Sequence, residues 1–192
     1  MRIFVCPNHI TQCLYELINS NFFFWKILKK LKTILKKYNP SIIFNLAAET
    51  HVDNSIRDSK VFVDSNIVGV HNILELIRNY RSEGKTIPTL IHFSTDEVYG
   101  DIDAGLHTET HLLKPSNPYS ATKAAADQLI LAWARTYNLP YVIVRPTNNY
   151  GVGQYTEKLI PKSIKYLGLG KKIPLHNEGT PIRNWLHAQD TA

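Results

Sequence analysis

Glycine is absent from the start of this 192-residue sequence, where the first glycine is Gly69. The residues before it therefore cannot form the Gly-rich turn that holds a dinucleotide at a helix N-terminus. Cysteine is nearly as scarce: Cys6 and Cys13 form neither a C-x-x-C pair nor a disulfide framework, which favours free thiols in a reducing, cytoplasmic compartment. The all-aromatic run Phe22–Trp25 is far shorter than the ~20 residues of a membrane-spanning helix.

Acidic residues are missing between Leu17 and Ala48, although the whole chain has 16 of them against 22 basic residues and a net charge of +6. Apolar residues recur at helical spacing in this stretch, from Ile27 to Tyr38. We therefore expect an amphipathic helix with a solvated basic face, and neither nucleic acid nor membrane as a partner. Contact with nucleic acid or anionic lipid is the alternative. The basic face consists of Lys26, Lys29, Lys30, Lys32, Lys36 and Lys37.

Short apolar runs alternate with helical patterns along the chain. The alternation predicts an α/β fold, a parallel sheet with right-handed crossovers. Asn117 and Pro118 have the residue types of an N-cap and a first helical position. Strands are expected at Arg2–Val5, Ile42–Ala47, Leu90–Thr95 and Tyr141–Val144. Helical segments are expected around Ile10–Ile18, in the lysine-rich stretch up to Asn39, at Val61–Tyr80 and at Tyr119–Tyr137.

The stretch Phe93–Gly100 places polar residues directly after a buried strand. Thr95, Asp96 and Glu97 fall at the carboxyl end of that strand, where open α/β sheets carry their chemistry. Adjacent carboxylates on a continuing strand point to opposite faces, so both can reach one substrate only if the backbone turns. Gly100 permits such a turn, and loop and cap roles for the carboxylates are the alternative.

Tyr119 and Lys123 are four residues apart on one expected helix, so their side chains share a face. An ammonium beside a phenol favours the phenolate, which can act as a base. Lowering a phenol pKa from ~10 to ~7 requires about 4 kcal/mol of differential stabilisation. We expect a cationic cofactor ring and partial burial to contribute to it.

With these residues in place, the chain resembles the extended short-chain dehydrogenase/reductase family and, within it, the dTDP-glucose 4,6-dehydratases. The resemblance extends from about Asn39 to the end of the chain. Thr-Asp-Glu at residues 95–97 separates this group from the related epimerases and decarboxylases. Four stretches carry the match: Asn45–Ser55, Ser94–Gly100, Asn117–Asp127 and Arg145–Gly151.

The resemblance implies NAD as cofactor and a nucleotide sugar, dTDP-glucose, as substrate. Tyr119, held by Lys123, would take the proton of the sugar 4-hydroxyl while hydride passes to NAD, and Thr95 would hydrogen-bond the same oxygen. Glu97 would remove the C5 proton as a base, and Asp96 would protonate the departing 6-hydroxyl. Elimination needs one acid and one base on neighbouring carbons, and two carboxyl groups can supply both.

The same resemblance implies two further sets of contacts. Alongside Tyr119 and Lys123, the cofactor would be lined by Leu46, Ala47, Ala48, Glu49, Ser65 and Asn149. The substrate would contact Thr50, Thr95, Asn148, Lys158, Leu159, Pro174, Leu175, His176 and Arg183. The eight histidines form no cluster at metal-ligand spacing, so no metal is expected.

The fold class implied is an incomplete Rossmann-like, doubly wound parallel sheet with only the start of the substrate lobe. We expect residues 1–173 to be a partial NAD-binding domain, in which residues 1–38 diverge from the family, and residues 174–192 to begin the substrate lobe. The missing Gly-rich turn and the end of the chain at Ala192 indicate a truncated sequence. The family also implies a homodimer. The alternatives are a UDP-glucose 4,6-dehydratase and a catalytically inactive fragment or interaction remnant.

Overall fold

The computed structural model describes residues 3–6, 12–13, 21–82, 84–102 and 104–192. Its contacts divide the chain into two compact units, Met1–Arg145 and Pro146–Ala192, each with its own sheet. The first unit ends earlier than residue 173, where the sequence places the functional boundary between cofactor and substrate lobes. That functional boundary stays a prediction.

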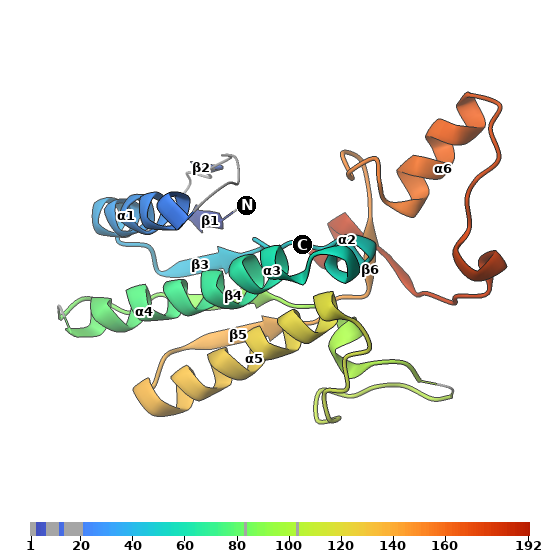
Figure 1. Cartoon of the computed structure of the whole chain (residues 1–192). Coiled ribbons are helices and arrows are strands. Elements are labelled where there is room, and N and C mark those ends of the chain that lie inside the picture. Colours follow the sequence, from blue (N-terminus) through green and yellow to red (C-terminus); the bar gives the residue numbers. More distant parts are fainter. Residues whose placement is uncertain (1–2, 7–11, 14–20, 83, 103) are drawn as a thin grey trace. The chain divides into compact units, whose positions relative to one another are not determined.

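The first unit is built on a five-stranded sheet with the order β2-β1-β3-β4-β5 (Figure 1). Three of its strands are β3 (Ile42–Asn45), β4 (Thr89–Phe93) and β5 (Tyr141–Val144). They are parallel, with Ile43 opposite Leu90 and Leu90 opposite Tyr141. The three apolar runs and the parallel α/β arrangement expected from the sequence are therefore confirmed.

The N-terminal strand departs from the all-parallel expectation. β1 (Ile3–Cys6) is antiparallel to β3, and β2 (Gln12–Cys13) is antiparallel to β1. Because β1 is antiparallel to both neighbours, β2 runs in the direction of β3. The helical turn expected around Ile10–Ile18 is wrong at β2, and its other residues lie outside the described part of the chain.

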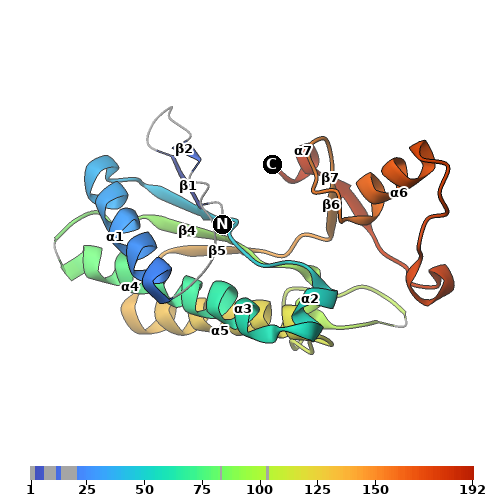
Figure 2. The same ribbon diagram turned by 45° about the horizontal axis from the view of Figure 1, so that its top comes forward.

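Three helices cover one face of the sheet. α1 (Asn21–Tyr38), α4 (Gly69–Ser82) and α5 (Pro118–Tyr137) contribute to one buried core with Ile43 and Leu90 of the strands. Figure 2 shows α4 and α5 running side by side under the strands. The lysine-rich helix is confirmed, since α1 buries Leu31 and Leu35 and ends before Asn39-Pro40.

The helix expected at Val61–Tyr80 is confirmed, and it contains a π-helical turn. It consists of α3 (Ser59–Phe62), a π-helical turn η1 (Val63–Val68) and α4, and it is preceded by the short helix α2 (Val52–Arg57). π-helical turns are uncommon and occur often at functional sites. Here the turn contains Asn66, a buried side chain that bonds the loop after β3.

The second unit contains a two-stranded parallel sheet of β6 (Asn148–Tyr150) and β7 (Trp185–His187). Thr147 Oγ1 donates to the carbonyl of Asn184 at 2.9 Å beside this sheet. The remaining elements are α6 (Leu159–Gly168), the 3₁₀ turn η3 (His176–Gly179) and α7 (Ala188–Thr191). Among all described residues of both units, no helix has the length and apolar character needed to cross a bilayer.

Candidate active site

The chain turns sharply where β4 ends. Thr95 caps the 3₁₀ turn η2 (Asp96–Tyr99), and its Oγ1 accepts a hydrogen bond from the backbone N–H of Glu97 at 3.3 Å. Thr95 Oγ1 also lies 3.3 Å from Asp96 Oδ1 and donates to it. The two neighbouring carboxylates therefore lie in a turn and not on the strand, where they would point to opposite faces. Such a turn is what both side chains need in order to face one ligand.

Gly100 closes this turn and has no substitute there. Its φ is +81°, in the region that favours glycine. A Cβ added at this position would lie 2.2 Å from the carbonyl oxygen of Lys114, so the close approach of the two backbone segments also requires glycine.

The N-terminus of α5 is fixed by a capping box. Asn117 Oδ1 accepts from Ser120 N at 2.9 Å, and Ser120 Oγ accepts from Asn117 N at 3.2 Å. Pro118 occupies the first helical position, so the expected cap is confirmed. The Asn117 amide also donates from Nδ2 to Glu97 Oε2 at 3.2 Å. One side chain therefore both starts the helix and orients a candidate base.

Tyr119 lies beside the residues of the β4 turn. Thr95 hydrogen-bonds its side chain, and the charges of Glu97 and Asp96 both act on its pKa. Its backbone N–H donates to Ser55 Oγ at 3.1 Å, and its ring packs edge-on against Phe62. The structure therefore brings the phenol and both carboxylates together, as the sequence predicts.

On the sequence alone, partial burial is expected to help lower the pKa of Tyr119. In the structure, burial raises this pKa above its usual value, and the negative charges of Glu97 and Asp96 raise it further, against the hydrogen bond from Thr95. Burial disfavours the phenolate because a charged group loses hydration. In the chain without a ligand, Tyr119 is therefore a neutral phenol.

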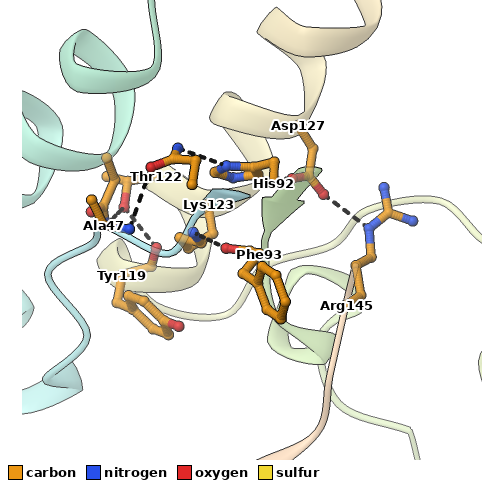
Figure 3. A network of polar contacts seen from close by, with 10 residues as sticks. Ala47, His92, Phe93, Tyr119, Thr122, Lys123, Asp127 and Arg145 are labelled. Carbon is orange, nitrogen blue, oxygen red and sulfur yellow. Dashed lines mark hydrogen bonds and ion pairs between the residues drawn. The ribbon is translucent and has the colours of Figure 1, made fainter. Parts of the chain in front are cut away.

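Lys123 is 2% exposed and points from α5 toward the end of β4 (Figure 3). Its Nζ donates to the carbonyl of Phe93 at 2.7 Å. Burial lowers the pKa of Lys123 to about 8, against the opposing effect of the Asp127 carboxylate. The ammonium has three N–H donors, and one of them bonds the Phe93 carbonyl. The others can donate hydrogen bonds to a bound ligand.

Two buried residues that the sequence analysis missed hold the site together. Asn66 Oδ1 accepts from Glu49 N at 2.9 Å, and its Nδ2 donates to Glu49 O at 3.0 Å and to Thr122 Oγ1 at 2.9 Å. Ser55 is fully buried and supports the backbone of Tyr119. The only signal for Asn66 in the sequence is a polar residue beside the apolar helical stripe that begins at Ile67.

The residues expected to line the cofactor in the first unit lie on two segments. The segment after β3 contains exposed Leu46, buried Ala47 and partly buried Ala48 and Glu49. Ser65 lies in the π-helical turn that bonds this segment through Asn66. Thr50, expected to contact the substrate, follows the same segment and is exposed.

The remaining expected contacts lie in the second unit. Asn149 in β6 donates from Nδ2 to Thr147 O at 2.8 Å and accepts a bond from Thr191. Arg183 is exposed, and its Nη1 donates to Ile182 O at 2.9 Å. The others are Asn148 in β6, Lys158 at the N-cap of α6, Leu159 in its first turn, exposed Pro174 and Leu175, and His176 at the start of η3.

Metal-ligating side chains do not gather in the described part of the chain. No three of its His, Cys, Asp or Glu residues are placed to hold a metal ion together.

Replacing Asn117 separates its two roles. Asn117→Ala should lower the free energy of unfolding by about 1 kcal/mol, because the N-cap acceptor is lost. Asn117→Ser retains a capping oxygen and removes only the donor to Glu97, so its stability should stay within about 0.5 kcal/mol of the parent. Urea unfolding measures both, and equal losses in the two variants would contradict the assigned cap.

Sequence comparison gives the chain's relatives. The sequence profile of the GDP-mannose 4,6 dehydratase family matches residues 27–192. A curated relative from Haemophilus influenzae named dTDP-glucose 4,6-dehydratase is 43% identical over 182 residues, which are 90% of this chain and 54% of the relative. Another from Escherichia coli with the name dTDP-glucose 4,6-dehydratase 1 is 42% identical, over 83% of this chain and 48% of the relative. The chain spans about half the length of the curated relatives it matches.

Solved structures agree with these relatives. A dTDP-glucose 4,6-dehydratase from Streptomyces venezuelae, crystallised with NAD, superposes with a TM-score of 0.79 at 39% identity, covering 85% of this chain and 49% of its own. A dTDP-glucose 4,6-dehydratase from Bacillus anthracis, in complex with NAD, gives a TM-score of 0.74 at 40% identity, with the same coverage of both chains.

Proposed function

The chain belongs to the GDP-mannose 4,6 dehydratase family, and from this premise we propose that its site serves the NAD-dependent dehydration of dTDP-glucose to dTDP-4-keto-6-deoxyglucose, a step of deoxysugar synthesis. The observation that carries the proposal is the convergence of Tyr119, Thr95, Asp96 and Glu97 at the end of β4. The names of the relatives and of the superposed structures support the same substrate.

The residues around Lys123 fit one end of NAD. The ammonium lies at the carboxyl end of a parallel strand, and the segment from Leu46 to Glu49 follows the neighbouring strand. Such strand ends are where open α/β sheets bind nucleotides. The first glycine of the sequence is Gly69, so the Gly-rich turn for a pyrophosphate is not supplied from its first strands. When bound, NAD supplies the hydride acceptor and donor for oxidation at C4 and reduction at C6.

The side chains of this chain then move the protons. Tyr119 takes the proton of the 4-hydroxyl as a phenolate. Because burial raises the pKa of this phenol, the phenolate requires a positive charge beside it. Lys123 supplies such a charge from the next turn of α5. Thr95 bonds the same oxygen, Glu97 removes the proton at C5, and Asp96 protonates the departing 6-hydroxyl. Glu97 is held for this task by the amide of Asn117.

A turnover assay with the full chain tests the proposal. The protein is incubated with NAD and dTDP-glucose, and mass spectrometry follows the loss of one water from the sugar. UDP-glucose in a parallel reaction tests the uracil nucleotide as the alternative substrate. The missing Gly-rich turn favours a second candidate function, that of a catalytically inactive relative. If the chain forms no product and binds no NAD, this second candidate replaces the first.

A further inference from the structure

A largely buried polar cluster lies behind Lys123 and is not used by the proposed chemistry. It consists of Asn45 at the end of β3, His92 in β4, Asp127 in α5 and Arg145 after β5. Figure 3 labels the last three of these residues. Asp127 and His92 are both 0% exposed. Burying an ionisable group is costly unless it is paired, so this cluster needs a physical explanation.

The hydrogen bonds of Asn45 fix the tautomer of His92. Asn45 Oδ1 accepts from the backbone N–H of Ala47 at 3.3 Å, so its Nδ2 is the donor to His92 Nδ1 at 3.0 Å. His92 Nδ1 is therefore an acceptor, and the ring proton is on Nε2. Burial, followed by the charge of Lys123, lowers the pKa of His92, so the ring is neutral. Its Nε2–H faces Asp127 Oδ1 across 4.0 Å.

Arg145 fixes the charge of Asp127. Its Nε donates to Asp127 Oδ2 at 2.9 Å, while its Nη1 donates to Tyr99 Oη at 2.6 Å. Burial raises the pKa of Asp127, and the hydrogen bond and charge of Arg145 oppose that shift. Arg145 thus holds one oxygen of the carboxylate. The other oxygen faces the N–H of His92 at 4.0 Å, which is beyond hydrogen-bond distance.

The Asp127 carboxylate favours the ammonium form of Lys123. Lys123 is four residues before Asp127 on α5, so the two side chains share a helix face. Burial acts to neutralise the amine, and Asp127 is the group whose charge acts against it. The other ionisable groups of this cluster are neutral His92 from β4 and Arg145, which is paired with Asp127.

We infer that Asp127 is a positioning residue, whose carboxylate, held by Arg145 and facing the N–H of His92, keeps the buried Lys123 ammonium charged and bonded to the Phe93 carbonyl. The role of Asp127 in catalysis rests on the proposed function, in which the charge of Lys123 stabilises the phenolate form of Tyr119.

NMR titration of the full chain tests it without NAD or substrate. In protein labelled with ¹³C at the lysine ε-carbon, the Lys123 signal, assigned by its loss in Lys123→Met, should titrate near pH 8. Asp127→Asn should move this midpoint down by about one pH unit. Asp64→Asn is the matched control, since Lys60 and Asp64 repeat the spacing on an exposed surface, and it should leave the Lys123 midpoint unchanged.

A midpoint in Asp127→Asn that equals that of the parent would overturn the inference. The ¹⁵N shifts of His92 in the unmutated chain give a second test that does not depend on a variant folding. They should show a neutral ring protonated at Nε2, and a ring protonated at Nδ1 would also overturn the inference. Because neither measurement involves turnover, failure of the turnover assay and failure of this inference are distinguishable.

Discussion

Under the proposed function, Tyr119→Phe is expected to lower the turnover of dTDP-glucose by about 10²- to 10⁴-fold, the usual contribution of a positioned acid–base group. The hydroxyl is the only group removed, and the edge-on contact of the ring with Phe62 does not involve it. Folding should therefore be retained while the proton acceptor for the 4-hydroxyl is lost. Steady-state rates and a thermal melt of the same preparations give the two readouts.

Tyr137→Phe is the matched control for that experiment. Tyr137 lies at the far end of the same helix, and its hydroxyl accepts a hydrogen bond from Arg78 Nη1 at 3.2 Å. Losing this part-buried bond should cost about 1 kcal/mol of stability and leave turnover nearly unchanged. Equal turnover by Tyr119→Phe and the parent would remove Tyr119 from the mechanism.

Asn66→Ala is expected to destabilise the first unit by about 3–5 kcal/mol, near the upper end for a point substitution. Asn66 is 1% exposed, and its amide satisfies both the N–H and the C=O of Glu49 as well as Thr122 Oγ1. Removing the amide takes away the partner of the part-buried N–H and C=O of Glu49, at about 1–3 kcal/mol each. Thr122 Oγ1 retains its bond to the carbonyl of Tyr119. Chemical denaturation measures the change.

Asn54→Ala serves as the control, because Asn54 is an exposed residue of α2. It should change stability by no more than about 0.5 kcal/mol. Asn66→Asp refines the test, since it keeps the acceptor for Glu49 N–H and loses the donor to Glu49 O and Thr122. A cost for Asn66→Ala no larger than that for Asn54→Ala would show that the amide does not hold the loop after β3.

The sequence predicts the elements that carry local signals. Ile42–Asn45, Thr89–Phe93 and Tyr141–Val144 are short apolar runs, and they form the three parallel strands. Asn117-Pro118 has the residue types of a helix start, and the structure contains the full capping box. Such signals depend on a few neighbouring residues, so they can be interpreted before the fold is known.

Features that depend on contacts distant in sequence were not predictable in the same way. The antiparallel β1 follows from pairing with β3 across the whole of α1. Asn66 and Asp127 are buried by partners far away in the chain, namely Glu49 and Arg145. The pKa of Tyr119 is a further example. The sequence spacing indicates one nearby positive charge, that of Lys123, which would lower this pKa. Burial and the carboxylates of Glu97 and Asp96, which raise it, can be identified only in the folded chain.

Calorimetric titration of the full chain with NAD tests the central claim most directly. The account predicts saturable binding that Lys123→Met weakens by about 10- to 100-fold, because charge-assisted hydrogen bonds to the cofactor are lost. Replacing the buried amine by an apolar side chain should leave the fold intact, which a thermal melt verifies. Absence of saturable NAD binding, or equal binding by the parent and Lys123→Met, would contradict the account.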